Sequence, residues 1–147
     1  ENIERYSAAN NHYVFEITET IEMDQIPAVQ NVFKEFVKND FRFAIDDFGT
    51  GYSNYGYMRD RTFDIVKVDR SFVTDIDKLK DNYLMVSFII KMAHEMGLHV
   101  CIEGVETKEE LSCVKKLGAD YIQGYYYGKP VCLQDFEEQH LKRFVLG

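Results

Sequence analysis

Short apolar segments alternate with helical segments along this chain of 147 residues, and no other feature restricts the possible folds as strongly. Apolar runs rich in β-branched and aromatic residues predict strands at residues 13–18, 41–46, 64–69, 99–102 and 121–122. Apolar spacing and capping residues predict the tail of a helix in 1–10 and further helices at residues 24–39, 54–59, 82–96, 107–117 and 135–144. Regular alternation of this kind predicts a parallel sheet with helical crossovers.

Five strand–helix units in 147 residues correspond to about 29 residues per unit. A complete barrel of eight such units takes roughly 250 residues. We therefore expect an α/β fold, a TIM-like (β/α)8 barrel of which residues 1–147 are the last five units. On this interpretation the chain is one partial domain, and roughly 100 residues at the front of the barrel precede it.

Charged and amide side chains fall within, or at the carboxyl end of, each predicted strand. They are Glu16, Asp46, Asp47, Lys67, Glu103 and Gln123. Because the carboxyl ends of parallel strands meet on one face of a barrel or sheet, we expect these side chains to converge there. A single polar residue in a strand is usually an edge or solvent-facing residue, but one in each of five successive strands favours a common site.

The pair Asp46-Asp47 ends an apolar strand and is followed at once by a loop that contains Gly49 and Gly51. Two acids before glycines are also compatible with an ordinary turn. Adjacent residues of a regular strand face opposite sides, so both carboxylates can reach one site only if the strand has already begun to turn. The two glycines favour that interpretation.

Composition excludes several other functions. A formal charge of −8 argues against binding a long nucleic acid, but allows a small phosphate ligand held through divalent cations. No apolar run approaches the 18 residues that a membrane span needs. Three cysteines without CxxC spacing indicate buried thiols in a reducing compartment, and hence a cytoplasmic segment. The four histidines form no metal-binding pair, so any metal must be held by carboxylates, which favours Mg²⁺ or Mn²⁺.

The sequence resembles the EAL-domain family, phosphodiesterases of the bacterial second messenger cyclic di-GMP. The matching segments are FEITE at 15–19, DDFGTGYS at 46–53, VKVDRSFV at 66–73, EGVET at 103–107, QGY at 123–125 and GKP at 128–130. They occur in the order of the family and cover almost the whole chain. The Glu-Ala-Leu motif that names the family, and an Asn metal ligand, belong upstream of Glu16 and are not in this sequence.

The resemblance implies roles for individual residues. Glu16, Asp46 and Asp47 resemble the family's metal ligands, for two ions of Mg²⁺ or Mn²⁺. Lys67, Glu103 and Gln123 resemble the catalytic groups around the attacking water. The resemblance also implies that Glu19 anchors the loop after Asp47, formed by Phe48, Gly49, Thr50, Gly51, Tyr52 and Ser53. Glu106 resembles a support residue near a dimer-facing end, and the substrate-binding positions are Asp69, Arg70, Gly124 and Pro130.

The resemblance further implies that the full-length protein hydrolyses cyclic di-GMP to linear pGpG in second-messenger signalling, while this segment alone is inactive. It implies a homodimer formed through EAL domains, with a GGDEF or sensory domain in the same chain. Three alternatives remain open. The domain could be a cyclic di-GMP receptor or a protein-interaction module without turnover. Lys67 could merely neutralise the carboxylates. A different Mg²⁺ barrel enzyme could use a lysine as its base, although the loop at 46–53 gives this no support.

Overall fold

The computed structural model describes residues 13–18, 27–50, 62–136 and 138. Its five strands are β1 (Val14–Thr18), β2 (Arg42–Phe48), β3 (Ile65–Val68), β4 (His99–Ile102) and β5 (Tyr121–Ile122). All four neighbouring pairs are parallel, and the strands lie in the sheet in the order in which they occur in the chain. The predicted parallel α/β architecture is confirmed, and this sequential order is that of neighbouring strands in a TIM-like barrel.

The described helical elements are α2 (Pro27–Lys38), the 3₁₀ turn η3 (Arg70–Phe72), α4 (Lys80–Glu95), α5 (Lys108–Leu117) and α6 (Leu133–Phe136). Helix α2 begins at Pro27, where proline has no helical hydrogen bond to lose. Thr107 and Glu110 form the predicted capping box of α5, and Gly118 ends this helix with a φ of 90°.

Several sequence predictions need correction at their boundaries. β2 continues to Phe48 instead of ending at Asp46, α4 begins at Lys80 instead of Asn82, and α6 begins at Leu133 instead of Asp135. The extension of β2 arises because the backbone keeps pairing with β3 beyond the two acids. The helices expected within 1–10 and at 54–59 lie outside the described residues, as does most of the helix expected at 135–144.

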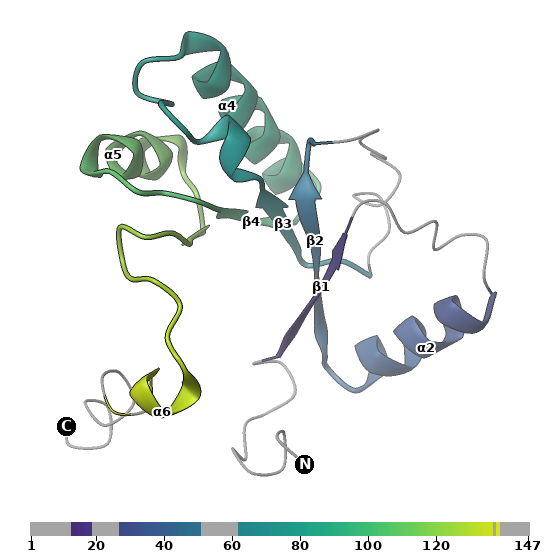
Figure 1. Ribbon diagram of the computed structural model, residues 1–147. Helices are drawn as coiled ribbons and strands as arrows, with labels where there is room; N and C mark the ends of the chain where they lie inside the picture. The colour runs from purple at the N-terminus through teal and green to yellow at the C-terminus, as the bar shows by residue number, and fades with distance from the viewer. Residues whose placement is uncertain (1–12, 19–26, 51–61, 137, 139–147) are drawn as a thin grey trace.

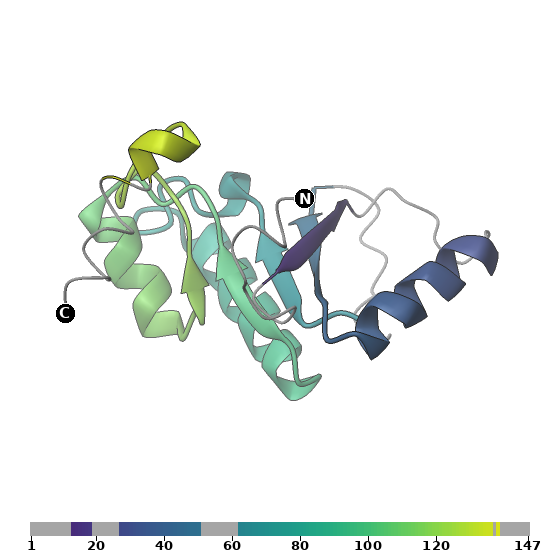
Figure 2. The same cartoon turned by 90° about the horizontal axis from the view of Figure 1, so that it is seen from below.

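Helices α4 and α5 lie on one face of the sheet (Figures 1 and 2). Helix α4 packs against α5 and β4, while α2 lies near the β1–β2 end of the sheet. Alternate strand residues point into this layer, because successive side chains of a strand face opposite sides. The main core joins these strand side chains to α4 and α5, and among its buried members are Phe43, Ile45, Val66, Val68, Val100, Ile102, Val86, Ile90 and Val114.

The other face of the sheet carries a smaller apolar cluster, formed by Ala44, Ile65 and Cys101. These residues alternate with the core residues in β2, β3 and β4, and Lys67 is two residues beyond Ile65 on the same face. This face is the one that becomes the inside of a barrel when a parallel sheet closes. None of the described helices combines the length and apolar character needed to cross a bilayer.

Candidate active site and metal centre

A β-bulge in β2 shapes the site. Ile45 pairs with Val66 and Phe48 pairs with Val68, so Asp46 and Asp47 together stand opposite the single residue Lys67. Asp47 has a φ of 53°, in the left-handed region that an aspartate tolerates better than most residues. The bulge breaks the alternation of side chains. β2 therefore departs from a regular strand at Asp46-Asp47, as predicted for two adjacent carboxylates that face one site.

The carboxylates of Asp46, Asp47 and Glu103 come together at this bulge. Each offers an oxygen within 4.8 Å of the others, although Glu103 follows a different strand, β4. Glu103 is held beside β3 because its backbone N–H donates to the Val68 carbonyl at 3.1 Å. Oxygen donors of this kind are the ligands that hard divalent cations prefer.

Lys67 lies at the centre of the acidic groups and is only 5% exposed. Its Nζ is 2.8 Å from Glu16 Oε1, 2.8 Å from Asp46 Oδ1 and 2.9 Å from Glu103 Oε1. These partners come from β1, from β2 and from the end of β4. Three of the residues expected to converge, Glu16, Asp46 and Glu103, therefore meet at one buried ammonium group.

The ion pairs fix the charge of Lys67. Burial lowers the pKa of this lysine, but the hydrogen bonds from its ammonium to Asp46, Glu16 and Glu103 outweigh that effect and hold the pKa above its usual value. Lys67 is therefore a cation and a hydrogen-bond donor at neutral pH, not a base. Burial raises the pKa of the Glu103 carboxyl, an effect that its contact with Lys67 only partly offsets.

The donor set fits divalent cations. Glu16, Asp46 and Glu103 contact the ammonium of Lys67, and Asp47 lies close to Asp46 and Glu103, so the ionised site carries an excess of three negative charges. Such an excess is costly in a partly buried site unless cations balance it. The close carboxylate group contains Glu103, which the family resemblance places among the catalytic residues. Glu16, an expected metal ligand, instead contacts Lys67 and has a half-exposed side chain.

A family model described as "EAL domain" matches residues 1–130. The chain belongs to the EAL-domain family. PdeB of Shewanella oneidensis, named a cyclic di-GMP phosphodiesterase, is 35% identical over 131 residues, which are 89% of this chain and 15% of PdeB. The chain spans between 14% and 20% of the length of four curated relatives that it matches, PdeB among them.

Solved structures of EAL proteins share the fold. The EAL enzyme Bd1971, in a form with cAMP and cyclic di-GMP bound, matches with a TM-score of 0.82 and 35% identity over 92% of this chain and 36% of that chain. BlrP1 of Klebsiella pneumoniae, solved as a complex with manganese and cyclic di-GMP, matches with a TM-score of 0.77 and 29% identity, covering 87% of this chain and 33% of that chain.

In this EAL chain, Gln123 borders the same cavity as Lys67. It follows β5, donates its backbone N–H to the Ile102 carbonyl at 2.8 Å, and lines a cavity of about 240 Å³ together with Glu16, Lys67 and Cys101. The cavity lies on the same sheet face as the Ala44–Ile65–Cys101 cluster. Burial raises the pKa of the Cys101 thiol to about 11, so this cysteine is a neutral part of the cavity wall.

Of the four residues expected to bind substrate, Asp69 and Arg70 follow β3, and Gly124 and Pro130 follow β5. Asp69 caps η3, because its Oδ1 accepts from Ser71 N at 2.9 Å, and Arg70 is 3.8 Å from Glu106 in an exposed ion pair. Gly124 lies tightly against the Val105 backbone. Asp69, Arg70 and Glu106 therefore have structural contacts of their own, which the motif alone did not indicate.

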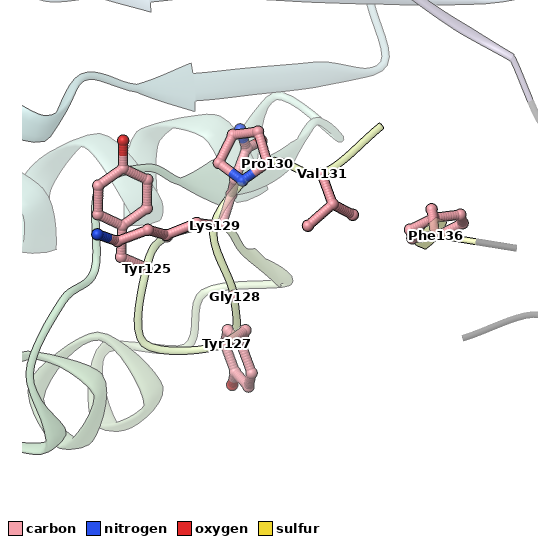
Figure 3. Close-up of a pocket in the computed structure, with 9 residues that line it drawn as sticks. Tyr125, Tyr127, Gly128, Lys129, Pro130, Val131 and Phe136 are labelled. Atoms are coloured by element: carbon pink, nitrogen blue, oxygen red, sulfur yellow. The ribbon is translucent and has the colours of Figure 1, made fainter. Parts of the chain in front are cut away.

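Gly124 and Pro130 border a second cavity of about 430 Å³ (Figure 3). Its other walls include the exposed rings of Tyr125 and Tyr127, and Lys129 Nζ lies 5.4 Å from the centre of the Tyr125 ring. Sequence reasoning singled out neither tyrosine. The run Tyr125-Tyr126-Tyr127, which starts at the last residue of the QGY segment, was the available signal, because a contiguous exposed apolar patch can mark a binding site.

The loop expected to support the site is described only at its start. Phe48 is buried, and the Thr50 hydroxyl donates to the Asp47 carbonyl at 2.9 Å, which ties the loop back to the bulge. Gly49 lies close to the Phe72 ring. Glu19, Gly51, Tyr52 and Ser53 lie outside the described residues.

Proposed function

We propose that this chain forms part of a metal-dependent phosphodiesterase that hydrolyses cyclic di-GMP to linear pGpG. The observation that carries the proposal is Lys67, buried and bound at 2.8–2.9 Å to three carboxylates at the strand ends. A buried cation among excess acids, in a family with relatives named as cyclic di-GMP phosphodiesterases, supports hydrolysis of a phosphodiester.

Glu16, Asp46 and Asp47, with Glu103 beside them, are the residues that would hold two ions of Mg²⁺ or Mn²⁺. Such ions supply an activated water and neutralise the charge of the phosphoryl oxygens. Lys67 contributes a fixed positive charge with N–H donors, which suits the oxygens of a phosphodiester in which negative charge develops. It remains a donor throughout, because its carboxylate partners keep it protonated.

Glu103 contacts Lys67 from the end of β4, and Gln123 borders the same cavity from the end of β5. In the proposed reaction the Glu103 carboxylate, 2.9 Å from Lys67 Nζ, accepts a proton from the attacking water. The Gln123 amide can hold the same water through a hydrogen bond, since it has both a donor and an acceptor. These residues are the proposed catalytic groups.

The cavity lined by Tyr125, Tyr127 and Pro130 supports a dinucleotide as the substrate. Tyrosine rings offer flat surfaces on which a purine base stacks, and Lys129 brings a positive charge next to one of them. Gly124 connects this cavity to Gln123 and hence to the lysine. Asp69 and Arg70 are proposed to contact the substrate from the β3 side.

We propose a homodimer as the assembled form. Helix α4 exposes the apolar side chains of Leu84, Met85 and Phe88, a surface that water does not favour. A further part of the proposal is a cytoplasmic protein in which a sensory or GGDEF domain belongs to the same chain. Loop residues 48–53, with Glu19 and Glu106, are proposed to link the dimer to the site.

The proposal is tested with the full-length protein, by separating cyclic di-GMP from pGpG after incubation with Mg²⁺ or Mn²⁺. We expect turnover with either ion and none with EDTA. Asp47→Asn should lower kcat at least 100-fold, because it removes one charged ligand. Asp81→Asn, the same change at an exposed position of α4, should leave kcat unaltered.

Binding of cyclic di-GMP without any pGpG, under all metal conditions, would replace this proposal with the receptor function. Full activity of Asp47→Asn would also contradict it, since the bulge would then not hold a required ligand.

A further inference from the structure

Glu110 is one of two charged residues that are buried within the described parts of the chain, the other being Lys67. It lies in the first turn of α5 and is 6% exposed. A buried carboxylate is costly unless hydrogen-bond donors satisfy it. The donors that satisfy Glu110 come from two loops of the site.

One carboxylate oxygen completes the cap of α5. Glu110 Oε2 accepts from Glu106 N at 2.9 Å and from Thr107 N at 3.0 Å. The Thr107 hydroxyl accepts from Glu110 N in return, at 3.2 Å. This much is the usual task of a glutamate at the third position of a helix.

The other carboxylate oxygen of Glu110, Oε1, makes a contact that capping of α5 does not require. Glu110 Oε1 accepts from Asp75 N at 3.1 Å, across 35 positions of the sequence. Asp75 belongs to the segment between η3 and α4 and has a φ of 56°, in the left-handed region. A residue in that region persists when its surroundings hold it there. The backbone hydrogen bonds lower the pKa of Glu110 despite its burial, so the carboxyl is ionised at neutral pH.

The segments joined by Glu110 both carry site residues. Residues 69–79 follow Lys67 and contain Asp69 and Arg70, while residues 103–107 begin with Glu103. The two segments touch directly, because a side chain at Gly104 would overlap the Arg70 Cβ. Segment 103–107 is also hydrogen-bonded to the residues that follow β5. Val105 N donates to the Gln123 carbonyl at 3.2 Å, and Tyr126 N donates to the Val105 carbonyl at 3.0 Å.

We infer that Glu110 is a positioning residue, which sets the spacing between the loop after β3 and the loop after β4. Through these loops it orients the Glu103 carboxylate and the two residues proposed to contact the substrate, Asp69 and Arg70. This inference rests on the proposed function for its substrate and metal, but the contact it describes is between parts of this chain.

Glu110→Gln separates the two tasks of the carboxylate. Its single carbonyl oxygen can still accept from the cap of α5, whereas the NH₂ group that replaces the other oxygen cannot accept from Asp75 N. Glu109→Gln is the matched control, because Glu109 lies in the same helical turn, carries the same charge and is exposed. The comparison therefore removes differences in helix-dipole energy.

The experiment measures amide hydrogen exchange of segments 69–79 and 103–107 in the full-length protein, together with Mn²⁺ affinity and the KM for cyclic di-GMP. For Glu110→Gln we expect at least 5-fold faster exchange in both segments. We expect a 3- to 10-fold loss of Mn²⁺ affinity and a similar rise in KM. Glu109→Gln should match the wild type in all three.

Two results would overturn the inference. One is a Glu110→Gln variant that exchanges like Glu109→Gln. The other is a variant that melts at a lower temperature while Mn²⁺ affinity and KM stay unchanged, which would make Glu110 purely structural. If the wild type itself does not hydrolyse cyclic di-GMP, the proposed function fails, and the exchange and Mn²⁺ measurements still decide the role of Glu110.

Discussion

Lys67→Met tests the electrostatic balance of the site most directly. Methionine keeps most of the length and apolar contact of the lysine stem, but removes the ammonium that three carboxylates share. Breaking a buried ion pair by deleting one partner costs about 3–5 kcal/mol, because the other charge is left uncompensated. Here Glu16 is half-exposed, so water screens part of the loss. We expect a loss of about 3 kcal/mol in the free energy of unfolding without metal.

The assay is urea unfolding of the full-length protein at pH 7.5, in EDTA and again with saturating Mn²⁺. Metal ions supply the positive charge that the variant lacks, so the difference between variant and wild type should shrink by half or more in Mn²⁺. Turnover should be lost in both conditions. Lys78→Met is the control: its ammonium is 2.6 Å from Asp75 Oδ1 but its side chain is 70% exposed, so unfolding should hardly change.

The pH dependence follows from the raised pKa of Lys67. A lysine whose pKa is higher in the folded than in the unfolded protein contributes its full stability below the unfolded value of about 10.4. This contribution is lost as the pH rises through the folded value. The difference between wild type and Lys67→Met should therefore persist at pH 9. A variant as stable as the wild type in EDTA, or a deficit that Mn²⁺ leaves unchanged, would refute this reasoning.

Two further changes test contacts away from the lysine. The pKa of the Asp120 carboxyl is lowered, because its hydrogen bonds, first of all the one with His94, outweigh the effect of burial. The ionised carboxyl therefore stabilises the fold above about pH 3.9, and this contribution is lost as the pH falls. Asp120→Asn should cost about 1–2 kcal/mol at pH 7 and clearly less at pH 3, as urea unfolding at the two pH values would show. Gly124→Ala should destabilise the protein by about 1–3 kcal/mol in thermal unfolding, because the added methyl would overlap the Val105 backbone. Gly128→Ala, with open space around it, should have little effect, and equal effects of the two would refute the reasoning.

The position of each strand could be read from the sequence because the apolar residues repeat in a simple pattern. The strands at 13–18, 99–102 and 121–122 were located to within one residue, and the capping box of α5 was identified from Thr107 and Glu110 alone. Local hydrogen bonding explains this success, since caps and strand patterns depend on neighbours in the chain. Boundaries such as the end of β2 depended on pairing with another strand.

The convergence of the site could also be predicted, but its contacts could not. Parallel strands bring their carboxyl ends together whatever the side chains are, so Glu16, Asp46, Lys67 and Glu103 were expected to meet. The sequence does not indicate that Glu103, and not Glu16, shares the close carboxylate group with Asp46 and Asp47. That choice depends on distances across the sheet.

The sequence by itself determined the order of the strands and helices along the chain, the polar residues at or near the strand ends, and the family. Only the tertiary structure decided how these residues contact one another. The bulge at Asp46-Asp47 needs β3 as its partner, and the second hydrogen-bonded oxygen of Glu110 needs a loop 35 positions away. Contacts of this kind depend on the separation of chain segments in space, which local pattern and propensity do not encode.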